Sequence, residues 1–167
     1  MRKKEKLTAY QYLLRDKLSG DKNRELIALL KDIKLASRQV SKELNSASLN
    51  NTLGELSGKK NTHGEAVKKF DIISNNLFIK SLENGGNCAG IVSEEKEKVL
   101  VFNNEVSRNS KYIVCIDPLD GSTNIDVNVP VGTIFSVLKR PNVTDKTFSK
   151  DFLQVGSKQV AAGYVLY

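Results

Sequence analysis

The feature that most constrains this chain is an apolar run that passes directly into a carboxylate-bearing turn. Tyr112–Ile116 is typical of a buried strand, and Asp117-Pro118-Leu119-Asp120-Gly121-Ser122-Thr123 follows it at once. Carboxylates placed at a strand end can share hard divalent cations through oxygen. A glycine turn with the backbone N–H groups after it can hold a phosphate. Together these features indicate metal-assisted hydrolysis of a phosphate ester.

Alternative interpretations apply to each acidic segment. Pro, Asp, Gly and Ser are turn residues, so the segment could be a plain turn. A plain turn does not require the order strand, then Asp-Pro-Leu-Asp-Gly-Ser-Thr-Asn, and we therefore favour the functional interpretation. Glu94-Glu95 alone is typical of a solvated hairpin tip, and Asp71 alone of a polar helix face. Glu65 could simply cap a helix, and His63 is an incidental loop residue rather than a metal ligand.

The residues before the motif predict two helices separated by a long loop. Apolar residues recur at helical spacing from Asp21 to Leu44. A second helix is expected to begin after Thr62, whose spacing to Glu65 matches a capping box, and to end near Asn84-Gly85-Gly86. The intervening residues 45–63 are rich in Asn, Ser, Gly and Thr, which predicts a loop.

After Gly86 the pattern changes to strands. They are predicted at 88–93, 98–102, 111–116, 131–138 and 158–167. If the first three run up, down and up, then Glu94 and Asp117 lie at the same edge of the sheet. The expected fold class is therefore α/β, in α+β layers, with helices packed on a mainly antiparallel or mixed sheet. The last strand is still apolar at Tyr167, so we expect a single domain over residues 1–167 that is incomplete at its C-terminus.

Several ionised carboxylates at one edge repel one another unless cations intervene. The candidates are Glu94, Glu95, Asp117 and Asp120 on the sheet, with Asp71 and Glu65 on the second helix. Because all are oxygen donors, the expected cofactor is Mg²⁺, two ions or more, with Mn²⁺ as the alternative. Zinc would prefer His or Cys. A carboxylate outside the metal shell, Glu95 or Asp71, could orient or deprotonate the attacking water.

Two metal ions could clamp the attacking and leaving oxygens of an in-line displacement. Glu94 could bridge the two ions, and Asp117, Asp120 and the Leu119 carbonyl could complete parts of their coordination shells. Gly121, Ser122 and Thr123 would then present donors to the phosphate.

Composition excludes some other classes of function. The apolar fraction is 40% and the charged fraction 27%, as in ordinary globular domains, and no segment has the length of a membrane span. The net charge of +7 would permit nucleic acid, but the lysines are scattered and aromatic residues are few, so we expect neither a nucleic-acid nor a membrane partner. Cys88 and Cys115 lie on apolar strands and are expected to be buried free thiols, which favours the cytoplasm.

At these residues the chain resembles the fructose-1,6-bisphosphatase family, within the magnesium-dependent, lithium-sensitive sugar phosphatases. The matching segments follow the family's order over roughly residues 20–167; they are Val67–Asp71, Val92–Glu95, Asp117–Asp126, Val131–Phe135 and Val160–Tyr167. Asn124-Ile125-Asp126 and Ser93-Glu94-Glu95 favour fructose bisphosphatase over inositol monophosphatase. The resemblance implies a sugar-phosphatase fold, a homotetramer, and release of the 1-phosphate of fructose 1,6-bisphosphate to leave fructose 6-phosphate, a gluconeogenic reaction.

The resemblance also implies roles for individual residues. The implied magnesium ligands are Glu94, Asp117, the Leu119 carbonyl and Asp120. The implied water-activating residues are Asp71 and Glu95, and Gly121-Ser122 would receive the 1-phosphate. Glu65 stands where the family has Asp on a mobile loop. Glu25, Lys111 and Tyr112 match part of the family's AMP-inhibition site, but Lys22-Asn23-Arg24-Glu25 matches its N-terminal helix only loosely.

Family members are considerably longer, and their later part supplies a further metal-binding glutamate and the residues that bind the sugar. The resemblance therefore implies that this chain corresponds to an N-terminal portion, with little activity by itself. Two alternatives remain. The parent could be another sugar phosphatase, such as a sedoheptulose bisphosphatase or inositol monophosphatase. The chain could also be a non-catalytic regulatory or assembly fragment that pairs through its sheet edge.

Overall fold

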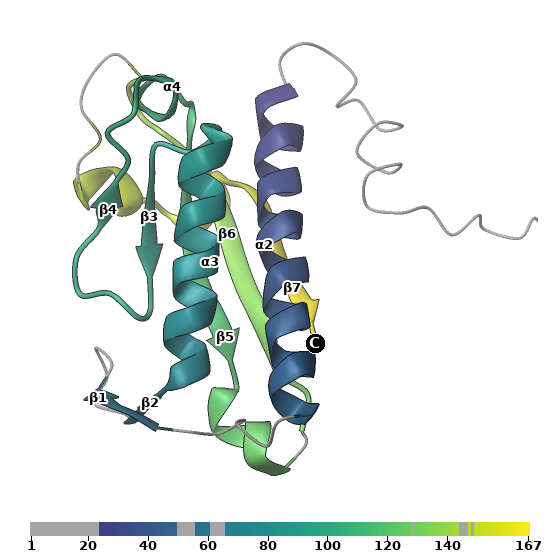
Figure 1. The fold of residues 1–167 in the computed structure, drawn as a ribbon. Helices are drawn as coiled ribbons and strands as arrows, with labels where there is room; N and C mark the ends of the chain where they lie inside the picture. Colours follow the sequence, from purple (N-terminus) through teal and green to yellow (C-terminus); the bar gives the residue numbers. More distant parts are fainter. Residues whose placement is uncertain (1–23, 50–55, 61–65, 128, 144–146, 148) are drawn as a thin grey trace, which may run out of the picture.

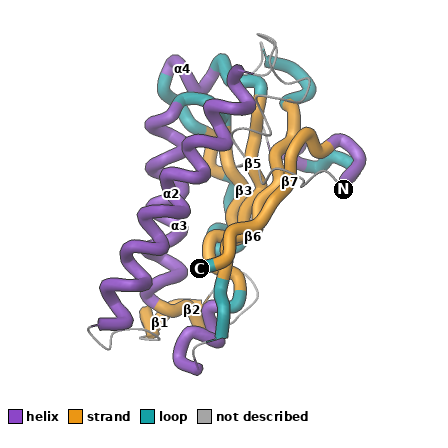
Figure 2. Tube along the Cα trace, turned by 90° about the vertical axis from the view of Figure 1, so that its right-hand side faces the viewer, coloured by secondary structure: helices purple, strands orange, loops and turns teal. Residues whose placement is uncertain are grey.

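The molecule has two layers, one of helices and one of strands. The computed structural model describes residues 24–49, 56–60, 66–127, 129–143, 147 and 149–167. Helices α2 (Arg24–Leu49) and α3 (Lys69–Gly85) lie side by side in opposite directions (Figure 1). After a quarter turn, both are seen on the same side of the sheet (Figure 2). The predicted fold class, helices packed on a mixed sheet, is confirmed.

The main sheet has five strands in the order β4-β3-β5-β6-β7. Their bounds are β3 Gly90–Ser93, β4 Leu100–Val101, β5 Tyr112–Asp120, β6 Gly132–Lys139 and β7 Gln159–Leu166. β3 runs parallel to β5 and every other neighbouring pair is antiparallel, so the predicted common edge for the ends of β3 and β5 is confirmed. Strands that run up, down and up in a simple meander would place β4 between β3 and β5, and that expectation is wrong: β3 lies between β4 and β5 and leaves the two-residue β4 at the border.

The core lies between the helices and the sheet. Along most of α2 every third or fourth residue is buried there, as the helical spacing predicts, and Phe78 of α3 is fully buried. The buried residues of this core include Leu26, Leu29, Ile33, Val40, Phe70, Phe78, Leu82, Ile91, Val114 and Val137. Each such side chain stabilises the fold by about 1.5–3 kcal/mol relative to an exposed one. The helices are thereby fixed to one face of the sheet.

Two predicted element boundaries are wrong. α2 continues to Leu49, past the predicted end at Leu44, and β1 (Leu56–Lys60) lies inside the predicted loop. β1 pairs antiparallel with β2 (Ala66–Lys68), which lies where the second helix was predicted to begin. Backbone pairing with β1 holds these residues extended, so α3 begins only at Lys69. Thr62, His63 and Glu65, which carry the predicted capping box, lie outside the described residues.

Shorter elements connect the strands. They are the helix α4 (Glu105–Arg108) and the 3₁₀ turns η2 (Ser122–Val127), η3 (Ser149–Phe152) and η4 (Gly156–Lys158). The Asn104 side chain caps α4 by accepting a hydrogen bond of 2.8 Å from the backbone N–H of Ser107. None of the helices within the described ranges is long and apolar enough to cross a membrane.

The second face of the sheet is only partly covered. Ala89, Ile113, Leu138 and Phe152 form a small cluster near the N-terminal half of β5. Towards β7 the face is open, and the apolar side chains exposed there are Ile134, Val160, Tyr164 and Leu166. Both cysteines are free thiols, as predicted. Cys88 is buried, whereas Cys115 is only half-buried because it lies beside this open face.

Candidate active site

The candidate carboxylates lie where β3 and β5 end. Ser93 pairs with Ile116 in the parallel ladder, and the backbone N–H of Glu94 donates to the Ile116 carbonyl at 3.1 Å. This pairing places Glu94 next to Asp117. Strand β4 and helix α4 lie between these two residues in the chain. Glu94 and Asp117 are close in space because β3 and β5 are neighbours in the sheet.

Helix α3 begins at the same edge. The Ser93 hydroxyl donates to Asn75 Oδ1 at 2.8 Å and accepts from the backbone N–H of Glu95 at 3.3 Å. Asp71 lies four residues before Asn75, so both occupy the same face of α3. Asp71 is only 4% exposed, in the first turn of the helix. The polar-face interpretation of Asp71 is therefore wrong, since this carboxylate points into the protein.

Glu94 and Asp117 share a hydrogen bond between their carboxyl groups. Burial first, then this hydrogen bond and the charge of Glu94, raise the pKa of Asp117 to about 7. The backbone N–H of Leu119, which donates to Asp117 Oδ1 at 3.1 Å, opposes the rise. Two carboxylates held this close repel each other once both are ionised. A divalent cation between them would remove the repulsion, so this donor pair fits Mg²⁺.

β5 contains a bulge at the motif. Asp117 pairs with Ile134 and Asp120 pairs with Gly132, so Pro118 and Leu119 together oppose the single residue Thr133. A spacing of three would place Asp117 and Asp120 on opposite faces of a regular strand. The extra residue brings both to the face defined by Ile134 and Gly132. The bulge also accommodates Pro118, which has no N–H to give to the ladder.

The glycine after the bulge turns the chain. Gly121 has φ +77°, a left-handed conformation that favours glycine. Its carbonyl accepts a hydrogen bond of 2.8 Å from the backbone N–H of Asn124. Ser122 is half-buried at this turn, whereas Thr123 and Asp120 are exposed. The turn therefore presents backbone and hydroxyl groups to solvent beside the carboxylate pair.

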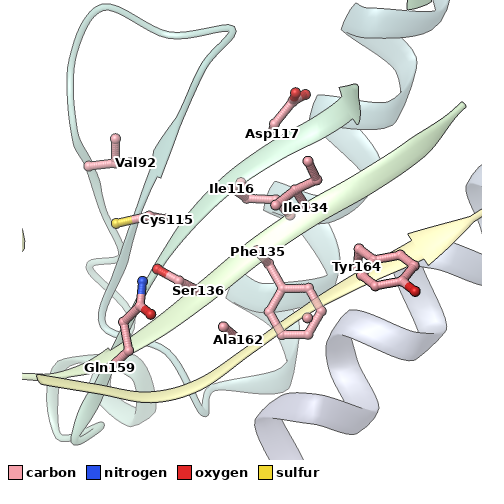
Figure 3. A pocket seen from close by; sticks show the side chains of 11 residues that line it. Val92, Cys115, Ile116, Asp117, Ile134, Phe135, Ser136, Gln159, Ala162 and Tyr164 are labelled. Carbon is pink, nitrogen blue, oxygen red and sulfur yellow. The ribbon is translucent and has the colours of Figure 1, made fainter. Parts of the chain in front are cut away.

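A shallow groove of about 790 Å³ lies beside Asp117 on the open face of the sheet. Figure 3 shows Asp117 at one end of the groove and Gln159 at the other. The floor is mostly apolar and includes Val92, Ile134 and Tyr164. The groove thus continues the acidic edge into an uncovered apolar surface.

The structure unites only part of the predicted site. It joins Glu94 with Asp117 and places Asp120 on the same face, with Glu95 following Glu94 in the chain. Within the described ranges, no group of three or more His, Cys, Asp or Glu side chains lies close enough to hold a metal ion. Glu65 lies outside the described residues. The structure also shows polar contacts that the sequence did not indicate, at Asn75, Ser93, Thr133 and Tyr167.

A second predicted group lies at the opposite end of β5. Lys111 Nζ and Glu25 Oε1 form an ion pair of 2.7 Å, and Tyr112 is buried beside them. The hydrogen bond and charge of Glu25 raise the pKa of Lys111, and burial raises the pKa of Tyr112. Glu25, Lys111 and Tyr112 are therefore neighbours, as the resemblance implied. Their role remains a prediction.

Comparison with known proteins extends these observations. Residues 8–167 match the family model described as fructose-1-6-bisphosphatase, N-terminal domain. The holo crystal structure of Leishmania major fructose-1,6-bisphosphatase is 30% identical, with a TM-score of 0.83, and the match covers 96% of this chain and 49% of that one. The apo structure of the same enzyme is 27% identical with a TM-score of 0.74, covering 96% and 47% respectively. The chain thus spans about half the length of these solved relatives.

Proposed function

The chain belongs to the fructose-1,6-bisphosphatase family, and on that premise we propose that it supplies most metal ligands of a magnesium-dependent sugar-bisphosphate phosphatase. The proposed reaction is hydrolysis of the 1-phosphate of fructose 1,6-bisphosphate, giving fructose 6-phosphate and phosphate. We further propose that the active protein is a longer one that contains this chain as its N-terminal domain. The matched share of the relatives, about half, supports this.

The proposed metal ligands are Glu94, Asp117, the Leu119 carbonyl and Asp120. When bound, Mg²⁺ would activate a water molecule and offset the charge that develops on the phosphate. Asp117 must lose its proton to serve as a ligand, and with its pKa raised to about 7 the metal-free carboxyl is still partly protonated at neutral pH, so a bound cation would displace that proton. The turn at Gly121 and Ser122 would donate to the phosphate oxygens, with Thr123 beside them.

Glu95 and Asp71 are the proposed proton acceptors for the attacking water. Glu95 follows the ligand Glu94 directly, and the Ser93 hydroxyl accepts from its backbone N–H. Asp71 lies in the first turn of α3 and is held in a buried position, from which it could accept the proton of the water. Glu65 is proposed as a further catalytic carboxylate on the family resemblance alone.

The observation that carries the proposal is the half-buried hydrogen bond between Glu94 and Asp117 at the end of two parallel strands. A structural ion pair would combine opposite charges, whereas this site combines like charges. Such an arrangement opposes folding unless a ligand offsets the repulsion, and a divalent cation is the ligand that two carboxylates select.

The test is phosphate release from a substrate panel by the 167-residue chain and by a longer protein that contains it. We expect Mg²⁺-dependent release from fructose 1,6-bisphosphate by the longer protein, and loss of that release in Glu94→Gln. Glu97→Gln is the matched control, because Glu97 is an exposed glutamate of the same turn. Release from inositol monophosphate or sedoheptulose bisphosphate alone would favour another phosphatase of the group.

Three further features are proposed on the family resemblance. The active protein is a homotetramer, it works in the cytoplasm, where free Cys88 and Cys115 stay reduced, and it binds AMP at Glu25, Lys111 and Tyr112. AMP titration of the longer protein, with Lys111→Met as the variant, tests the last of these.

A further inference from the structure

Thr133 is the residue that faces the bulge. Its side chain is fully buried on the helix side of β6, and it is the single residue that opposes Pro118 and Leu119. The Thr133 hydroxyl donates to the Pro118 carbonyl at 2.8 Å. This bond crosses from β6 to β5 at the one point where the regular ladder between them is interrupted.

The Thr133 hydroxyl has a second partner, which is half-buried. Thr133 Oγ1 lies 2.7 Å from the hydroxyl oxygen of Tyr167. Because Thr133 gives its only proton to the Pro118 carbonyl, Tyr167 must be the donor in this contact. The Tyr167 hydroxyl also lies close to the side chain of Ser37 of α2, whose hydroxyl donates to the Ile33 carbonyl at 2.9 Å. The backbone N–H of Tyr167 donates to the Val131 carbonyl at 2.9 Å, which holds the backbone of Tyr167 beside the start of β6.

These contacts connect the residue that follows β7 to the motif. They run from the half-buried Tyr167 hydroxyl through the buried Thr133 hydroxyl to the Pro118 carbonyl. Pro118 follows the ligand candidate Asp117 directly, and the next peptide carries the Leu119 carbonyl. Holding the Pro118 carbonyl therefore fixes the orientation of the segment on which the proposed ligands lie.

We propose that Thr133 is a positioning residue for the cation site, and that Tyr167 supports it. The proposal rests on the function proposed above, because it assumes that Asp117 and its neighbours bind the ion. Groups that orient metal ligands through hydrogen bonds affect metal affinity without touching the metal. Thr133 acts in this way through the backbone of the bulge rather than through a ligand side chain.

The test is calorimetric titration of the folded 167-residue chain with Mn²⁺ alone, well below its unfolding temperature. Thr133→Val keeps the shape and removes the hydroxyl, and we expect it to weaken Mn²⁺ binding roughly tenfold. Thr133→Ser keeps the hydroxyl and should bind Mn²⁺ like the wild type. Tyr167→Phe should show a smaller loss, because the bond to Pro118 remains. Ser136→Ala is the matched control on the same strand, since the Ser136 side chain bonds Cys115 on the other face.

The outcomes separate the two proposals. If Asp117→Ala abolishes Mn²⁺ binding while Thr133→Val and Tyr167→Phe both bind like the wild type, the positioning role is wrong and the metal site stands. If wild-type binding is absent, or is unchanged in Asp117→Ala, the proposed metal site and the role of Thr133 are both wrong. If Thr133→Val does not fold, Tyr167→Phe decides, and an affinity equal to that of Thr133→Ser overturns the proposal.

Discussion

Replacement of Asp117 by Asn should stabilise the metal-free chain while removing its response to metal. In the wild type, Asp117 is half-buried beside Glu94, and its pKa is raised to about 7. The introduced amide would carry no charge, yet it can still accept from the Leu119 N–H and donate to Glu94. The substitution therefore removes the repulsion and keeps both hydrogen bonds.

The size of the stabilisation by Asp117→Asn follows from the raised pKa of Asp117 in the wild type. A rise from 3.8 to about 7 corresponds to about 4 kcal/mol, because each pH unit contributes about 1.36 kcal/mol. Asp117 is only half-buried, so solvent screening reduces the expected gain to about 1–2 kcal/mol. For a chain of this length, that gain raises Tm by roughly 2–8 °C.

The stability advantage of Asp117→Asn over the wild type depends on pH. The folded wild type binds a proton at Asp117 more tightly than the unfolded chain does, so its stability falls as pH rises from about 4 to 7. Below about pH 4 the carboxyl is protonated in both states, and the advantage of Asp117→Asn should vanish. At about pH 8 the advantage should be complete.

The assay is thermal and urea unfolding at about pH 4 and about pH 8, with EDTA and then with Mg²⁺. With EDTA at the higher pH we expect Asp117→Asn to be more stable than the wild type. Mg²⁺ should stabilise the wild type and leave the variant unchanged, since only binding to the native state shifts the midpoint. Glu97→Gln, which removes an exposed carboxylate, should match the wild type throughout. An Asp117→Asn chain that is less stable at the higher pH, or that gains equally from Mg²⁺, would refute the reasoning.

Three other predictions concern activity and association. In the longer protein, Asp117→Ala or Asp120→Ala should abolish phosphate release, a loss of several decades, while Asp126→Ala costs less; equal mild effects in a steady-state assay would indicate a plain turn. The isolated chain should show almost no turnover on fructose 1,6-bisphosphate, because remote substrate contacts are missing; family-like turnover by a monomeric chain would contradict this. The chain should self-associate through its open sheet face, and sedimentation velocity should show that Tyr164→Lys reduces this whereas Leu153→Lys, also at an exposed side chain, does not.

The sequence predicted the parts of the fold that depend on local patterns. The helical spacing in α2 and the apolar run before Asp117 correspond to buried faces in the structure, because periodicity reports directly which side chains meet the core. The β1–β2 pairing was missed, since these strands are short and have no regular alternation of apolar and polar residues. The placement of β3 between β4 and β5 was missed because strand order depends on contacts between distant segments.

The site likewise divides into residues that a local pattern indicates and residues that only contacts between distant segments reveal. Glu94 and Asp117 were grouped correctly because the prediction of parallel strands was correct. The buried contact of Ser93 with Asn75, and that of Thr133 with Pro118, join residues far apart in sequence and use side chains with no charge. Such residues look like ordinary strand or helix positions until the neighbouring element is known. Thr133 and Tyr167 lie within segments that match the family, but the match alone assigns them no role.

Because of the bulge in β5, the geometry of the site depends on the number of residues between the two aspartates as well as on their type. Asp117 and Asp120 share a face only because one extra residue stands between their partners on β6. If the same residues paired without the bulge, Asp120 would oppose Val131 and turn to the other face of the sheet. Substitution of the acidic residues alone tests their side chains and does not test this spacing. A homologue that retains every acidic residue but pairs these strands in a regular ladder would therefore have lost the geometry.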